Sequence, residues 1–127
     1  MDKEFADLYR FVKEAHKYSA WAQQCTIEQR AIDVKAEVDE LLTELERKNM
    51  PEFKKELGDV FWDVLCLIAK AEEEGLVDVK ELLQNVHEKF KQRKPFVQEK
   101  RKATAEEEAR IWREVKKREQ HERHKTR

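Results

Sequence analysis

The chain has 127 residues, with 27 Lys or Arg against 28 Asp or Glu, so its formal net charge at pH 7 is −1. This balance argues against nucleic-acid binding by bulk charge, and 127 residues fit one domain rather than separate catalytic and substrate domains. With 43% charged residues and only two Gly and two Pro, the composition excludes a sheet-rich fold and is typical of long helices.

We therefore predict an all-α fold in a single domain over residues 1–127: a bundle of four main helices followed by a polar helical tail. Cys25 and Cys66 lie far apart in the sequence, which suggests neither a zinc site nor a disulfide framework. No stretch approaches the roughly 18–20 apolar residues that span a bilayer, and the N-terminus lacks the apolar run of a signal peptide. We expect a cytoplasmic protein with no membrane partner.

The first two helices are predicted from apolar periodicity and a capping residue. Apolar residues recur at helical spacing over about residues 2–18, which predicts the first helix. Residues 19–26 interrupt this pattern. Thr26, followed by Glu28 and Gln29, is typical of an N-cap, so a second helix is expected over about residues 27–48.

The later helices are bounded by proline and glycine. Pro51 suits the first turn of a third, strongly apolar helix that ends near Gly75. Gly58 inside it costs about 1 kcal/mol relative to Ala, so we expect a neighbouring helix or a ligand to approach the backbone there. A fourth helix begins near Val79 and is stopped by Pro95. The tail, residues 103–127, has so little apolar surface that it must dock on a partner surface or fray.

Two acidic pairs stand inside the apolar patterns of the second and third helices. Glu37 and Glu40 form one pair, and Glu56 and Asp59 form the other. Residues three apart share a helix face, with Cβ atoms roughly 5–6 Å apart. Two such helices side by side would bring four carboxylates together, which suits Mg²⁺ or Mn²⁺. The alternative is a solvated helix face, the usual fate of Asp and Glu. Asp63, one turn further, could be a further ligand, act as a base for water, or be exposed, and we place it behind the four ligands.

Basic and aromatic residues offer contacts for a nucleotide. Lys89 and Arg93 lie four apart on one helix face and could hold phosphates; the alternative is surface charge that favours the helix dipole. Trp21 and Trp112 could stack on a base, although aromatic residues more often pack at core edges.

Together these motifs resemble the MazG-type all-α nucleoside triphosphate pyrophosphohydrolases, whose mark is an EExxE helix followed by an ExxD helix. Residues 36–40 (AEVDE) and 56–59 (ELGD) match these elements, with Ala36 in place of the leading Glu. Three further stretches are similar to family segments: SAWAQQCT to CPWDxxQT, KFKQRKPFV to KxxRRHPHVF, and IWREVKKRE to WxxxKxxE. Cys25 replaces a family Gln, and Lys94 replaces a family His.

The resemblance implies hydrolysis between the α- and β-phosphates of an NTP or dNTP, giving a nucleoside monophosphate and pyrophosphate. At the level of the family it also implies a role in housecleaning of the nucleotide pool. It implies Mg²⁺, with Mn²⁺ as a substitute, and a homodimer or homotetramer, which the unpaired apolar stripe of the first helix also suggests. Carried over by position, the metal ligands are Glu37, Glu40, Glu56 and Asp59, and the substrate contacts are Lys89, Arg93, Trp112 and Lys116. Glu37 or Glu40 would accept the proton of the attacking water.

Two other functions remain open at this point. One is a non-catalytic helical interaction module, which predicts neither metal dependence nor turnover. The other is a nucleic-acid patch along residues 89–102, which contain Phe90 and Phe96; the overall charge balance disfavours it. Base preference, the number of metal ions and the choice between dimer and tetramer do not follow from these patterns.

Overall fold

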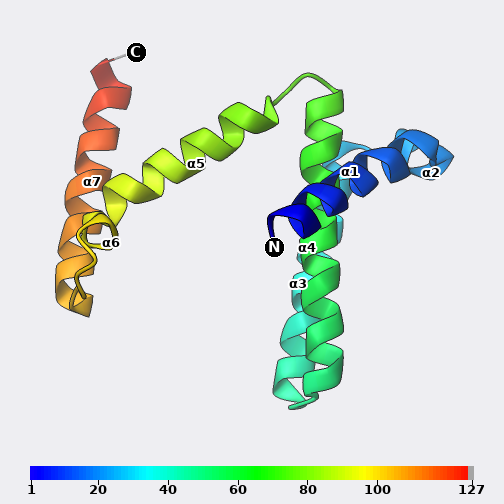
Figure 1. Cartoon of the computed structure of the whole chain (residues 1–127), viewed down its shortest axis with the longest axis horizontal. Coiled ribbons are helices and arrows are strands. Elements are labelled where there is room, and N and C mark those ends of the chain that lie inside the picture. The colour runs from blue at the N-terminus through cyan, green and yellow to red at the C-terminus, as the bar shows by residue number, and fades with distance from the viewer. Residues whose placement is uncertain (126–127) are drawn as a thin grey trace. The chain divides into compact units, whose positions relative to one another are not determined.

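The computed structural model describes residues 1–125, which form seven helices and no strand (Figure 1). The all-α prediction is thus confirmed. The helices are α1 (Asp2–Tyr18), α2 (Ala20–Gln24), α3 (Ile27–Glu46), α4 (Met50–Glu73), α5 (Val79–Arg93), α6 (Pro95–Gln98) and α7 (Ala105–Lys125). They form two compact units, Met1–Val79 and Lys80–Arg127, which are described separately. The last two residues of the predicted tail, 126 and 127, lie outside the described residues. None of the helices in the described range is long and apolar enough to cross a membrane.

In the first unit, α3 and α4 pack side by side as an antiparallel hairpin (Figure 1). Thr26 caps α3, because its hydroxyl oxygen accepts a hydrogen bond of 3.0 Å from the backbone N–H of Gln29. Lys48, with φ at 57°, takes the left-handed conformation that ends a helix, and Asn49 then caps α4 by accepting from the N–H of Glu52. This short turn sets the register in which residues of α3 face residues of α4.

Helix α1 packs across the C-terminal part of α4. The buried residues Val12, Cys66 and Ala69 form a small apolar core, with Trp62 partly buried against it. The Tyr9 hydroxyl donates a 3.3 Å hydrogen bond to Glu72. The core therefore covers only one end of the hairpin.

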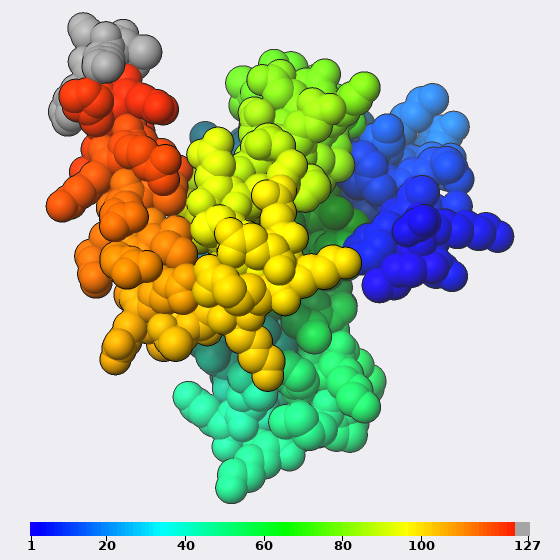
Figure 2. Space-filling view, turned by 60° about the vertical axis from the view of Figure 1, so that its left-hand side comes forward, coloured from blue at the N-terminus to red at the C-terminus, as the bar shows by residue number. Residues whose placement is uncertain are grey.

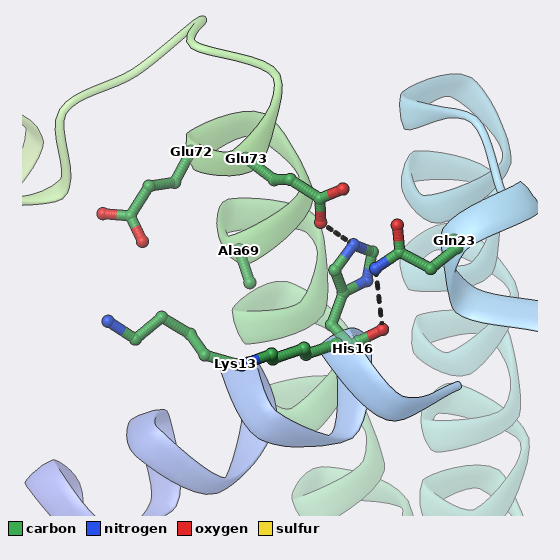
Figure 3. Close-up of a pocket in the computed structure, with 7 residues that line it drawn as sticks. Lys13, His16, Gln23, Ala69, Glu72 and Glu73 are labelled. Carbon is green, nitrogen blue, oxygen red and sulfur yellow. Dashed lines mark hydrogen bonds and ion pairs between the residues drawn. The ribbon is translucent and has the colours of Figure 1, made fainter. Parts of the chain in front are cut away.

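Polar contacts fasten α1, α2 and α4 at that end. The buried imidazole of His16 forms an ion pair with Glu73, which points toward it in Figure 3. The Gln23 side chain donates to the His16 carbonyl oxygen at 3.0 Å, and the buried Lys70 donates to the Gln23 carbonyl oxygen at 3.3 Å. These bonds hold α2, and with it Trp21, against α4.

The other end of the hairpin leaves apolar side chains in solvent. We call the following residues the hairpin apolar face: Val38, Leu42, Leu45, Met50, Leu57 and Phe61. Leu42 is 51% exposed and Leu57 is 49% exposed. Figure 2 shows the side chains around the α3–α4 turn, in cyan and green, standing free at the lower end of the view. The packing of α1, α2, α3 and α4 within the first unit does not bury this surface.

The expectation for Gly58 is wrong as far as a neighbouring helix of this chain is concerned. A Cβ added to Gly58 would meet no atom within 4 Å in the described chain. The reason is that α1 and α3, which pack most extensively on α4 among the described helices, both leave the backbone of Gly58 uncovered.

In the second unit, α7 docks on α5 rather than fraying. Arg93 of α5 donates to Glu119 of α7 at 3.0 Å, and Phe96 of α6 and Val115 of α7 are buried. In the connection between α6 and α7, the Arg101 guanidinium binds both carboxylate oxygens of Glu107. The tail thus finds its docking surface within its own unit.

The cap of α3 yields a stability prediction. Changing Thr26 to Ala should lower the free energy of unfolding by about 1 kcal/mol, because the N–H of Gln29 loses its acceptor. Urea denaturation followed by circular dichroism would measure this change. Thr43→Ala is the matched control: its exposed hydroxyl bonds only the Asp39 carbonyl oxygen in mid-helix, so little loss is expected there. Equal losses in both variants would contradict the capping role.

Candidate metal and nucleotide site

Three carboxylates converge where α3 faces α4. One oxygen from each of Glu37, Glu56 and Asp59 lies within 4.8 Å of the other two. Glu37 and Glu56 are partly buried, and each has a buried carboxylate oxygen with no hydrogen-bond partner among the described residues. A buried carboxylate oxygen without a donor is costly, and carboxylate oxygens are the ligands that Mg²⁺ and Mn²⁺ prefer. The donor set therefore fits a hard divalent cation.

The close approach raises the pKa of these groups. Burial, together with a hydrogen bond to Glu56 and the charge of Glu40, raises the pKa of Glu37 to about 7. For Glu56, the hydrogen bond with Glu37 acts to lower the pKa, but burial and the carboxylates of Glu40 and Asp59 outweigh it and raise the pKa overall. The main causes of both shifts include no basic side chain. The cluster holds unbalanced negative charge.

Glu40 and Asp63 border this cluster. Glu40 is exposed and lies outside the group of three, although its charge acts on both Glu37 and Glu56. Asp63 is half-buried, which excludes the fully exposed alternative. Burial and the nearby Asp33 raise its pKa, while Arg30 acts to lower it.

Sequence reasoning missed Arg30. Its side chain is buried, and its guanidinium carbon lies 4.9 Å from the centroid of the Trp21 ring. Trp21 itself is 61% exposed, with Arg30 against one face of its ring. The spacing of seven residues between Arg30 and Glu37 places both on one face of α3, and this was the signal available in the sequence.

The remaining predicted substrate contacts lie in the second unit. The Trp112 ring has the Lys116 ammonium 4.1 Å and the Arg93 guanidinium carbon 5.6 Å from its centroid. Arg93 and Trp112 line a cleft of about 430 Å³ together with Phe90, Lys94, Ala105, Glu108 and Ala109. The structure therefore brings Arg93, Trp112 and Lys116 together. Lys89 is exposed on α5 and does not line this cleft.

The comparisons with known proteins identify the family. The family model of the MazG nucleotide pyrophosphohydrolase domain matches residues 26–98, which is more than half of the chain, and the chain belongs to this family. The matched residues include all four predicted metal ligands, Lys89 and Arg93.

A solved structure supports the same assignment. The crystal structure of a MazG-related protein from Thermotoga maritima matches with a TM-score of 0.83 at 26% sequence identity, covering 88% of this chain and 98% of that chain. No curated protein matches the chain.

Proposed function

We propose that this chain is a Mg²⁺-dependent nucleoside triphosphate pyrophosphohydrolase that cleaves an NTP or dNTP between the α- and β-phosphates. The products would be a nucleoside monophosphate and pyrophosphate. The observation that carries the proposal is the cluster of Glu37, Glu56 and Asp59, with buried carboxylate oxygens that lack donors, inside the segment that matches the family. Housecleaning of the nucleotide pool in the cytoplasm is the role that the family suggests.

In this proposal the carboxylates of α3 and α4 bind the metal ion, and one of them also acts as a general base. Glu37, Glu40, Glu56 and Asp59 hold Mg²⁺, or Mn²⁺ in its place. The ion would neutralise charge on the triphosphate and make water nucleophilic near neutral pH. Because α3 and α4 are long, packed helices, they hold the carboxylates in a fixed geometry. Glu37 or Glu40 also accepts the proton of the attacking water, through a carboxylate oxygen that the metal does not occupy.

Within the second unit, the proposed contacts to phosphate are basic side chains near Trp112. Arg93 and Lys116, both close to the Trp112 ring, offer charge-assisted hydrogen bonds to phosphate, and Lys89 offers a further exposed ammonium. In the free chain the Arg93 guanidinium forms an ion pair with Glu119, so a phosphate would compete with this carboxylate for the guanidinium. Trp112 provides an aromatic face for the nucleotide.

Product analysis tests the activity. The purified chain is incubated with a panel of canonical and modified NTPs and dNTPs, with Mg²⁺ or with a chelator, and the products are separated. Monophosphate and pyrophosphate in equal amounts, formed only with Mg²⁺, are the expected result. Orthophosphate as the first product would contradict the cleavage position. No turnover across the panel would favour the non-catalytic interaction module.

We also propose that the chain forms a homodimer or homotetramer through the hairpin apolar face. The face comprises six large apolar residues that the described chain leaves exposed, on two helices that continue past the small core. Exposed apolar surface of this extent on a soluble domain marks an interaction site. A second copy would bury it and would also lie near the open backbone of Gly58.

Changing Leu42 to Lys should disrupt this assembly, because a charge at the centre of an apolar interface loses its water without a partner. The expected result in size-exclusion chromatography with light scattering is a shift of the wild-type oligomer toward monomer. Leu76→Lys serves as the control, since Leu76 is 66% exposed but lies in the turn after α4. A wild-type monomer, or equal effects of both changes, would contradict the proposed face.

A further inference from the structure

A small cavity in the first unit lies close to the carboxylate cluster along α3. Its volume is about 130 Å³, and Trp21, Ala22, Arg30, Trp62 and Cys66 are among the residues that line it. Most of the lining is aromatic or apolar, and the polar side chains at the walls are those of His16, Ser19 and Arg30. Sites for drug-sized ligands have volumes of roughly 300–1,000 Å³, so this cavity has room for a single ring.

Two residues that line this cavity, His16 and Arg30, have buried side-chain nitrogens without a hydrogen-bond partner among the described residues. The His16 imidazole has the Glu73 carboxylate beside it, but within the described range no such carboxylate pairs with Arg30. Arg30 is only 6% exposed, and its Nε has no hydrogen-bond partner among the described residues. The Trp21 ring covers the guanidinium but cannot accept a directed hydrogen bond from Nε in its place. A buried charged donor without an acceptor is costly, so this position is suited to an acceptor brought by a ligand.

Two carboxylates lie near Arg30 without pairing with it. Asp33 follows one turn later on α3, and Asp63 of α4 responds to the charges of both Arg30 and Asp33. No ion pair joins Arg30 to either carboxylate among the described residues. Asp33 and Asp63 are not among the residues that line the cavity, so Arg30 supplies the charged donor at its wall. A donor at this wall is suited to a carbonyl oxygen on the edge of a nucleobase.

The position along α3 agrees with a nucleotide bound lengthwise. Arg30 and Glu37 are seven residues apart, which corresponds to about 10 Å along a helix. A ribose joins a base to its phosphates over a comparable distance. Asp33 and Asp63 would repel phosphates from the Arg30 end, so the triphosphate would extend toward the Glu37 end, where the metal ligands lie.

We infer that this cavity receives the nucleobase of the substrate, that Arg30 donates a hydrogen bond to a carbonyl oxygen of the base, and that the site selects single-ring pyrimidine nucleotides. The inference rests on the proposed function for the identity of the substrate class. It assigns to Arg30 the reading of the base and to Trp21 the placement of the guanidinium.

Calorimetric binding of nucleoside monophosphates tests this without requiring turnover. In the presence of Mg²⁺, dCMP and dTMP should bind wild-type protein at least about tenfold more tightly than dAMP and dGMP. Arg30→Met keeps the apolar stem but removes the donors, and should weaken pyrimidine binding about tenfold while leaving purine binding unchanged. Arg30→Lys keeps the charge but loses the planar fork, and should also weaken pyrimidine binding.

Purines binding as tightly as pyrimidines, or pyrimidine affinity unchanged in both variants, would overturn the inference. If neither variant folds, the affinities of wild-type protein for pyrimidine and purine monophosphates still test the inference. Pyrimidine-selective binding without pyrophosphate release would instead remove the proposed activity and leave the base site. Pyrophosphate release with no base preference in binding would support the proposed activity and overturn the proposed base site.

Discussion

Glu56→Gln is expected to lower kcat/KM for pyrophosphate release by on the order of 100-fold or more at saturating Mg²⁺. The glutamine has nearly the same shape but provides one neutral oxygen where Glu56 shares a cluster with Glu37 and Asp59. The cation would lose charge and a ligand, and the triphosphate would lose its counter-charge. A coupled pyrophosphate assay on the purified variant measures the loss.

Glu52→Gln is the matched control for this experiment. Glu52 lies one turn earlier on α4 and forms an ion pair with Lys55 at 3.0 Å, outside the carboxylate cluster. Surface pairs of this kind contribute little, so activity within about twofold of wild type is expected. Activity retained by Glu56→Gln, or lost equally in both variants, would remove Glu56 from the site.

Glu37→Gln should separate stability from activity. Without metal at pH 8 the variant should be about 1 kcal/mol more stable than wild type, because burial and the neighbouring carboxylates disfavour the ionised Glu37. The gain stays well below the full equivalent of the pKa shift, since Glu40 and Asp59 leave the cluster open to screening water. The same variant should be nearly inactive, because it lacks a metal ligand.

The pH dependence of this difference has a definite sign. The folded pKa of Glu37, about 7, is higher than its ordinary value of 4.5. The folded protein therefore binds the proton more tightly than the unfolded chain, and the stability of wild type falls as pH rises from about 4.5 to about 7. The advantage of Glu37→Gln should appear over this window and level off above it. Urea denaturation at pH 5, 6, 7 and 8 with a chelator measures it.

Metal addition completes the test of Glu37. Mg²⁺ binds the folded protein and should raise the melting temperature of wild type, but raise that of Glu37→Gln much less. Glu46→Gln, at the exposed end of the same helix, should respond to Mg²⁺ as wild type does. A metal-free Glu37→Gln that is less stable than wild type at pH 8 would show that the carboxylate is structural rather than poised for a cation.

The carboxylate cluster thus destabilises the metal-free protein locally, and the packing of the rest of the fold compensates for this cost. Two long helices with an apolar interface hold Glu37 and Glu56 partly buried without a basic partner. Conflicts of this kind are expected at functional sites, where a ligand relieves the strain that the free protein bears.

The amino-acid sequence by itself determined the five longer helices, because their signals are local, whereas the short helices α2 and α6 were not predicted. Thr26 caps α3 as predicted, Pro51 lies in the first turn of α4, and Gly75, with φ at 75°, follows the end of that helix. The carboxylates within each pair, Glu37 with Glu40 and Glu56 with Asp59, share a face through helical spacing alone. Family motifs then placed both pairs in one class of enzyme.

Only the tertiary structure decided how these local elements combine. The register of α3 against α4 places Glu37, rather than Glu40, within 4.8 Å of Glu56 and Asp59, and this depends on the rotation of two packed helices. The burial of Arg30 likewise requires α2 to carry Trp21 onto it, through contacts between residues distant in the sequence. Spacing along one helix reports which side chains share a face, but the partner of that face is selected by packing, which no local pattern encodes.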